Sequence, residues 1–235
     1  MEGVISLVEL KEKISRSYAK ALKGSKESGD LSCCGGQGEI SFGCYLMDEE
    51  LFQFLRPGMT VVDFGSGPGK DLLLAAEIIG PNGKAIGLDF TTEMLKELKQ
   101  NAKRRNLKNV IPIEADIEHI PLESNSVDVI ISNCVINLTI NKQLVFNEAF
   151  RLLKSGGFLL DADVIAESSF DEKLQTNEKL WCSCISGALT EEKYADLLKK
   201  AGFVDISIKY AGKGQIQFEE KTYGIQSGLI YARKP

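Results

Sequence analysis

A glycine-rich turn behind an aspartate is the segment of this chain best suited to bind a nucleotide. Residues 61–69 read Val-Val-Asp-Phe-Gly-Ser-Gly-Pro-Gly and lie between an apolar run of strand length and a run of helix length. A turn this tight needs residues without a Cβ, and glycine lets the backbone approach a ligand closely. Dinucleotide-binding turns space their glycines G-x-G-x-x-G, whereas Gly65, Gly67 and Gly69 follow the tighter pattern G-x-G-x-G, which favours a ligand without a pyrophosphate. The alternative is a turn that binds nothing.

Two further acidic residues occur where the sugar and base of a nucleotide are expected. Asp89 ends the second apolar run, about twenty residues beyond the glycine turn, where a carboxylate can accept hydrogen bonds from both ribose hydroxyls. Asp116 closes the third apolar run and is followed by Ile117, so this pair could accept the adenine amino group and cover the adenine face. The alternatives are that Asp89 only caps the next helix and that Asp116 is an ordinary loop acid.

The cysteines are the second set of residues that could do chemistry. No secretory segment is recognisable in the sequence, so they are expected to be reduced thiols that can bind or react. Thiolates select soft ions, whereas the C-x-x-C pairs typical of zinc sites are missing from the sequence. The alternative for each cysteine is a small buried apolar side chain. The six are Cys33, Cys34 and Cys44 in a segment rich in glycine and serine, Cys134 directly after the fourth apolar run, and Cys182 and Cys184.

Apolar runs of strand length alternate with amphipathic runs of helix length from residue 60 onward. This alternation predicts an α/β fold with a doubly wound, mostly parallel, seven-stranded sheet and helices on both faces. Ahead of it we expect a helix over 5–22 and a mobile, cysteine-bearing loop over 24–43. The last two strands, after a helix capped by Thr190, fit an antiparallel hairpin at the sheet edge. The expected strands are 60–64, 84–88, 110–113, 127–132, 158–164, 204–210 and 225–232, and the expected helices 71–79, 91–104, 142–153 and 190–200.

Length and composition favour a single large domain with three parts. With 235 residues, we expect 1–55 to form a cap that carries the first cysteines, 56–165 a nucleotide-binding core, and 166–235 a substrate-side insertion plus strands that complete the same sheet. The net charge of −5 and the lack of a dense basic run argue against a nucleic-acid partner. No transmembrane or secretory segment is recognisable, so we expect no membrane partner and a cytoplasmic location.

Over residues 60–164 the glycine turn and the two acids resemble the class I methyltransferase superfamily, a Rossmann-like fold that binds S-adenosylmethionine. In that superfamily the cofactor lies across the carboxyl ends of the strands. The resemblance implies that the cofactor-binding residues are Asp63, Gly65, Ser66, Gly67, Gly69, Asp71, Asp89, Phe90, Met94, Asp116, Ile117 and Asn133.

Several segments also resemble the arsenite methyltransferases: 131–138 around Cys134, Gly43 with Cys44, 117–121, and 184–189. The resemblance implies that Cys44, Cys134 and Cys184 hold As(III), a soft and thiophilic centre. Its lone pair would attack the sulfonium methyl, so no general base is needed, and His119 is expected to be a structural or cofactor-side loop residue.

The resemblance also assigns a redox role to the N-terminal cysteines. Cys33 or Cys34 would exchange disulfides with Cys44, and a thiol reductant of the glutathione or thioredoxin type would act as co-substrate. One departure from the family is that Tyr45, Leu46 and Met47 follow Cys44, where members typically have Gly, Asn and Pro.

Two rival interpretations remain open. One is a methyltransferase acting on carbon, nitrogen or oxygen of an organic small molecule, with incidental cysteines. Such an enzyme normally needs a positioned base for an oxygen nucleophile, and the chain has one histidine. The other is a non-catalytic, thiol-based protein that binds a metalloid. The acid and glycine set argues against it, because a pure binder has no use for a cofactor cleft.

Overall fold

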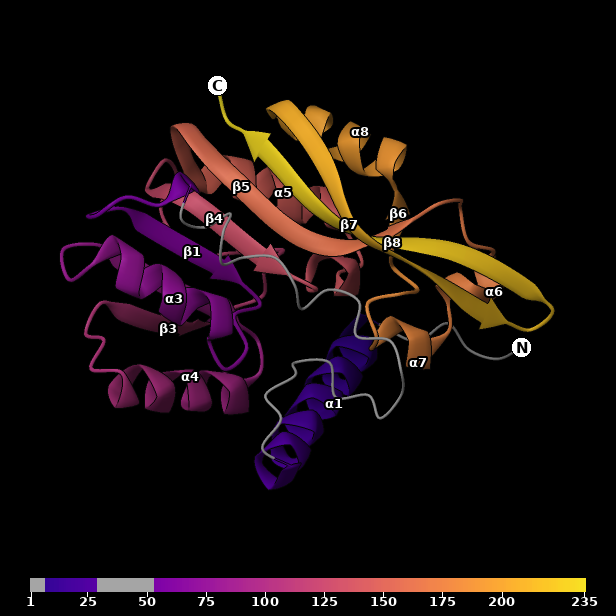
Figure 1. The fold of residues 1–235 in the computed structure, drawn as a ribbon, viewed down its shortest axis with the longest axis horizontal. Coiled ribbons are helices and arrows are strands. Elements are labelled where there is room, and N and C mark those ends of the chain that lie inside the picture. The colour runs from indigo at the N-terminus through magenta and orange to yellow at the C-terminus, as the bar shows by residue number, and fades with distance from the viewer. Residues whose placement is uncertain (1–6, 29–52) are drawn as a thin grey trace.

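The computed structural model describes residues 7–28 and 53–235, which form a layered α/β fold around one mixed sheet (Figure 1). The strands follow the order β3-β2-β1-β4-β5-β8-β7, and β6 pairs with β5 off this path. The prediction of a doubly wound α/β fold is therefore confirmed. The strands are β1 (Thr60–Phe64), β2 (Lys84–Asp89), β3 (Val110–Glu114), β4 (Val127–Asn133), β5 (Leu153–Ala166), β6 (Leu189–Thr190), β7 (Val204–Phe218) and β8 (Lys221–Arg233).

Helices cover both faces of this sheet. Leucines and alanines of α3 and α4 pack on one face, and apolar residues of α5 and α8 pack on the other. The longer helices are α1 (Leu7–Ser28), α3 (Lys70–Ile79), α4 (Thr92–Arg104), α5 (Lys142–Leu152) and α8 (Glu191–Ala201), and the short ones are η1 (Ile136–Leu138), α6 (Glu172–Gln175) and α7 (Glu178–Trp181).

The strand order reverses between β1 and β4. Both strands are parallel and paired in register, and the chain leaves β1 toward β2 on one side, whereas β4 continues to β5 on the other. The connecting segments therefore diverge at this point and leave a crevice outside the carboxyl ends of the strands, the usual ligand position in open α/β sheets. The glycine turn follows β1, and Cys134 follows β4.

The expected C-terminal hairpin is present, since β8 runs antiparallel to β5 and β7 antiparallel to β8. Strand β7 extends eight residues beyond the expected end at Tyr210. Its continuation through Gly212 and Gly214 lacks the apolar alternation that reveals a strand, and the register shifts between Tyr210 and Gly212. The two-residue β6, too short to show any pattern, was missed and makes the sheet eight-stranded.

Helix α1 corrects another expectation, because it continues past Leu22 to Ser28 where a loop was expected from Gly24. One glycine costs a helix only about 1 kcal/mol, which the rest of a long amphipathic helix can offset. The remainder of the expected loop, over 29–43, lies outside the described residues. In the described part of the chain, no helix is long and apolar enough to cross a membrane.

A buried hydrogen bond joins α8 to the middle of the sheet. The Tyr194 hydroxyl donates to Asp161 on β5, and both residues are fully buried. Burial raises the pKa of that carboxyl, while the tyrosine hydrogen bond opposes the rise.

Tyr194→Phe should lower the free energy of unfolding by about 2 kcal/mol, because it leaves a buried carboxyl group short of its donor. Urea denaturation of the purified protein measures the change. Tyr210→Phe is the matched control: its hydroxyl contacts Glu191 on the exposed surface, and its loss should cost less than about 0.5 kcal/mol. Equal losses of unfolding free energy in the two variants would show that the buried hydrogen bond between Tyr194 and Asp161 stabilises the fold no more than the exposed one does.

Candidate active site

A cavity opens at the carboxyl ends of β1, β2 and β4 and is closed on one side by α1. Eleven of the twelve residues expected to bind the cofactor line it, and so does Cys134. Its remaining lining includes three residues of α1 that the sequence analysis did not select. The expected residues in the lining are Asp63, Gly65, Ser66, Gly67, Asp71, Asp89, Phe90, Met94, Asp116, Ile117 and Asn133.

The three glycines of the turn have three different roles. Gly65 has a φ of +64°, and a Cβ there would lie 2.4 Å from a methyl carbon of Val135. Gly67 also has positive φ, but a Cβ would meet nothing within 4 Å, because this residue faces the open cavity. Gly69 is the one residue of the twelve that does not line the cavity. It is the N-cap residue of α3, and a Cβ there would collide with Leu98, so its observed role is helix packing.

Asp89 is held rigidly at the cavity wall. One carboxylate oxygen accepts from the backbone N–H of Gly67 at 3.0 Å, and the other accepts from Thr91 at 2.8 Å. Burial raises the pKa of this carboxyl, and the backbone hydrogen bonds lower it in part. Thr91 is the N-cap residue of α4. Asp89 therefore supports the start of that helix and faces the cavity at once, so the two interpretations of this residue do not exclude each other.

Two buried polar atoms of the cavity wall have no hydrogen-bond partner in the described part of the chain. They are Ser66 Oγ and Asn133 Oδ1. The amide nitrogen of Asn133 donates to Asp71 at 2.9 Å, which orients the side chain. Asp63 lies beneath the turn, where burial, followed by the charges of Asp71 and Asp89, raises its pKa well above the ordinary value. Unsatisfied polar atoms beside these acids suit a polar ligand with several hydrogen-bonding groups.

At the opposite end of the cavity, Lys11 of α1 contacts the acid expected at the adenine. Its ammonium group donates to Asp116 and, at 3.0 Å, to Glu118. Burial lowers the pKa of Lys11, but the hydrogen bonds and charges of both carboxylates together raise it above its ordinary value. Ile117 is buried between these acids and lines the cavity. His119 is exposed and does not line this cavity.

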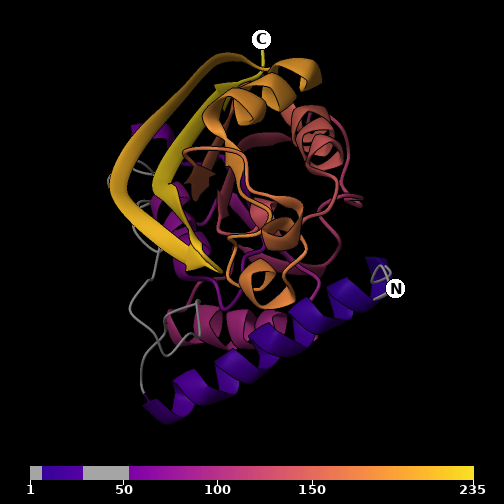
Figure 2. The same cartoon turned by 90° about the vertical axis from the view of Figure 1, so that its right-hand side faces the viewer.

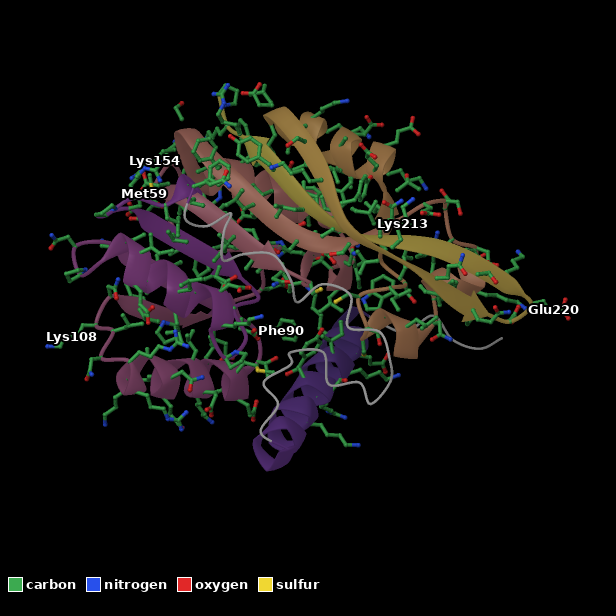
Figure 3. All side chains as sticks on the ribbon, viewed as in Figure 1. Met59, Phe90, Lys108, Lys154, Lys213 and Glu220 are labelled. Carbon is green, nitrogen blue, oxygen red and sulfur yellow. The ribbon has the colours of Figure 1, made fainter. Side chains whose placement is uncertain are left out.

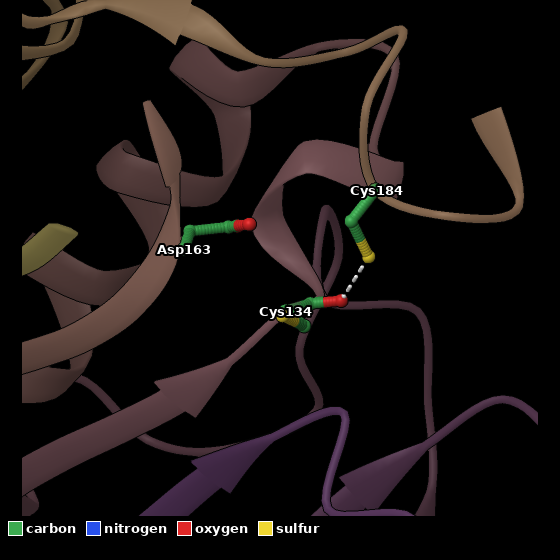
Figure 4. A group of neighbouring side chains, drawn as sticks. All are labelled: Cys134, Asp163 and Cys184. Carbon is green, nitrogen blue, oxygen red and sulfur yellow. Dashed lines mark hydrogen bonds between the residues drawn. The ribbon is translucent and has the colours of Figure 1, made fainter. Parts of the chain in front are cut away.

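The structure brings together two of the three cysteines expected to hold arsenic. Cys134 follows β4, Cys184 precedes β6, and the Cys184 thiol donates to the Cys134 carbonyl at 2.7 Å (Figure 4). Both are buried, and both have positive φ, 53° and 61°. That conformation costs a residue with a side chain about 1–2 kcal/mol, and such strain concentrates at functional sites. Cys33, Cys34 and Cys44 lie outside the described residues.

Asp163 is fully buried and lies beside the two thiols. One of its oxygens and the two sulfur atoms of Cys134 and Cys184 all lie within 4.8 Å of one another. Asp163 accepts from the backbone N–H of Asn137 at 2.9 Å and from its side-chain amide at 2.8 Å. Burial and the neighbouring Asp161 raise the pKa of Asp163, and the hydrogen bonds from Asn137 and Val164 oppose this.

The two cysteine-bearing loops are joined by contacts around Lys142. Its ammonium group donates to the Thr139 carbonyl at 3.0 Å and lies 5.9 Å from the centre of the Trp181 ring. Trp181 in turn donates from Nε1 to the Leu138 carbonyl at 3.0 Å. A Cβ at Gly187 would lie 1.9 Å from the Asn137 carbonyl oxygen, so the loop after Cys184 passes directly against the turn after Cys134.

Apolar side chains surround the thiols. Ile14, Leu138, Cys134 and Cys184 form one buried cluster. Phe90, which Figure 3 places between the sheet and α1, packs on it together with Tyr18, Trp181, Val135 and Cys182. Cys182 therefore lies at the edge of the cluster.

Sequence reasoning missed Lys11, Ile14, Tyr18, Lys142 and Asp163. The spacing of Lys11, Ile14 and Tyr18 on one helix face could have been noticed in the sequence. So could the carboxyl group of Asp163 inside an apolar strand. Lys142 gives no such indication, since its burial depends on a distant tryptophan.

Comparison with known proteins gives both a family and similar relatives. A family model described as a methyltransferase domain matches residues 55–202. Arsenite methyltransferases from Halobacterium salinarum and Aquipseudomonas alcaligenes are 35% and 34% identical to this chain, over 77% and 83% of its length. The matches cover 46% and 62% of those proteins, so the chain spans about half to three fifths of these relatives. The crystal structure of an arsenic(III) S-adenosylmethionine methyltransferase from Chlamydomonas reinhardtii has a TM-score of 0.66 and 25% identity, over 94% of this chain and 73% of that one.

Lys142 gives a testable pH dependence. Burial lowers its pKa from 10.5 to about 8, against the attraction of Asp163 and Cys184. Between these pH values the unfolded chain keeps a proton that the folded protein has released, so stability rises with pH across this range. Relative to Lys142→Met, the wild type should gain roughly 2 kcal/mol in free energy of unfolding between pH 7 and pH 9.5.

Urea denaturation at both pH values gives this difference. Lys103→Met, on the exposed side of α4, controls for the loss of one positive charge on a helix. A difference between wild type and Lys142→Met that stays constant with pH would show that the buried ammonium keeps its proton.

Proposed function

This chain belongs to the methyltransferase-domain family, and from that premise we propose that it transfers a methyl group from S-adenosylmethionine to trivalent arsenic held by cysteine thiolates. The observation that carries the proposal is the buried pair Cys134 and Cys184, which adjoins the cavity lined by the glycine turn and Asp89. The similarity of this chain to arsenite methyltransferases supports trivalent arsenic as the methyl acceptor.

The residues of the cavity fit the cofactor. Asp89 is fixed to accept the ribose hydroxyls, and Gly67 leaves open space where a side chain would block the ligand. Asp116 and Ile117 serve the adenine, while Ser66, Asp71 and Asn133 offer polar atoms at the amino-acid end. When bound, the cofactor supplies an electrophilic methyl group on a sulfonium sulfur.

Arsenic binding follows from the chemistry of the thiols. As(III) is soft, and thiolates compete for it better than oxygen ligands do. Cys134 and Cys184 supply two ligands, and Cys44 supplies the third. Three sulfur ligands in a pyramid leave one lone pair on arsenic, which serves as the nucleophile.

Methyl transfer then depends on the relative position of the two bound partners rather than on a proton transfer. The arsenic lone pair would form the As–C bond as the methyl group leaves the sulfonium sulfur, and S-adenosylhomocysteine would be the second product. Holding both partners in place can supply roughly 7–11 kcal/mol of the barrier. Arsenic is formally oxidised from As(III) to As(V), so two electrons must return from thiols, which form a disulfide. Cys33 or Cys34 with Cys44 provides these electrons, and a thiol reductant reduces the disulfide again.

The proposal is tested by incubating the protein with methyl-labelled S-adenosylmethionine, excess thiol and arsenite, beside a control without arsenite. Chromatography of the products should show label on arsenic. Cys134→Ser and Cys184→Ser should each abolish transfer by removing a soft ligand, while calorimetry shows unchanged binding of S-adenosylhomocysteine. Asp89→Ala should instead weaken that binding by about 1–3 kcal/mol.

Cys182→Ser is the matched control and should be nearly silent, and thermal melts exclude misfolding. Substituting Cys33 and Cys34 together should impair the first methylation more than the second. If folded Cys134→Ser still methylates arsenite at the wild-type rate, the thiolate mechanism is wrong. Organic acceptors for an enzyme with incidental cysteines would then be sought.

A further inference from the structure

Helix α1 presents one face to both ends of the cavity. Lys11, Ile14 and Tyr18 are spaced three and four residues apart, so their side chains lie on the same side of the helix, and all three line the cavity. Figures 1 and 2 show α1 lying across this end of the molecule, next to α4 and α7. Arg16, on the opposite side of α1, is exposed and forms an ion pair with Glu12, one turn earlier on the same helix.

The three residues contact different parts of the site. Lys11 is bonded to Asp116 and Glu118 at the adenine end. Ile14 is 2% exposed and packs with Cys134 and Cys184. The hydroxyl oxygen of Tyr18 lies 3.8 Å from the sulfur of Cys184, within the longer hydrogen-bonding range of that atom.

We propose that Tyr18 is a positioning residue of the methyl-acceptor site, which holds the sulfur of Cys184, and that Lys11 on the same helix face serves the cofactor end. This inference rests on the proposed function. It assigns α1 a part in both binding sites, whereas the sequence predicted no site residue on this helix.

The direction of the hydrogen bonds explains why Tyr18 matters when substrate is bound. In the structure the thiol of Cys184 donates a hydrogen bond to the Cys134 carbonyl. A sulfur bonded to arsenic has no proton, so that hydrogen bond is lost and the sulfur can only accept. The Tyr18 hydroxyl can still donate, and it then becomes the contact that fixes the position of this sulfur within the apolar cluster.

Steady-state kinetics separates the two roles on α1. Tyr18→Phe keeps the ring and removes the hydroxyl, so it should raise the KM for arsenite roughly five- to tenfold, the value of one hydrogen bond, with the KM for S-adenosylmethionine within twofold of wild type. Lys11→Met should give the opposite split, with a KM for S-adenosylmethionine raised at least threefold, because Asp116 loses the group that orients it. Arg16→Ala should change neither value.

A binding measurement without turnover keeps this inference separate from the proposed function. Phenylarsine oxide, a trivalent arsenical that needs two thiols, is titrated into protein whose Cys33, Cys34 and Cys44 are serine. Tyr18→Phe should weaken its binding at least threefold, and Cys184→Ser should abolish it. Equal affinity with and without the Tyr18 hydroxyl would overturn the inference, even if arsenite is methylated. If Tyr18→Phe weakens the binding of phenylarsine oxide but the wild-type protein fails to methylate arsenite, the inference about Tyr18 stands and the proposed reaction is wrong.

Discussion

The close packing of Val135 against Gly65 is the constraint on which the site depends. These residues follow neighbouring strands, β4 and β1, whose carboxyl ends lie side by side. Because no Cβ fits at Gly65, the turn after β4 can press directly onto the glycine turn. The left-handed backbone of Cys134 starts that turn, so its thiol is fixed close to the cavity lined by Asp63 and Asp89. Nucleotide-binding and thiol-bearing segments thus share one contact surface.

A second layer of contacts keeps Cys184 beside Cys134, although fifty residues separate them in the chain. Asp163 and Asn137 fix the turn, and Gly187 and Trp181 hold the later loop against it. The same region holds the buried carboxyl group of Asp163 and the buried ammonium group of Lys142. Such groups destabilise a core unless they are paired and hydrogen-bonded. Their presence beside two strained cysteines indicates a part of the fold where the geometry of the thiols takes precedence over stability.

Much of the fold could be predicted from the sequence, because strand and helix periods in the core are local properties. The positions of β1 to β4, the glycine turn, and Asp89 at the cavity wall all followed from such patterns, whereas β5 begins at Leu153, five residues before its expected start. The meeting of Cys134 with Cys184 followed only from resemblance, since no local rule joins a strand end to a loop fifty residues later. The spacing of Lys11 and Tyr18 on one face of α1 was visible in the sequence, but not their contacts with the cleft, because the docking of α1 depends on tertiary packing.

Arsenic K-edge X-ray absorption of the arsenite-loaded protein shows whether Cys134 and Cys184 together hold trivalent arsenic beside the cofactor cleft. We expect the nearest neighbours of arsenic in the wild type to be all sulfur. Cys184→Ser and Cys134→Ser should each replace one sulfur with oxygen, while Cys182→Ser leaves the spectrum unchanged. A spectrum dominated by oxygen in the wild type, or one that neither Cys134→Ser nor Cys184→Ser alters, would show that these two thiolates do not hold arsenic.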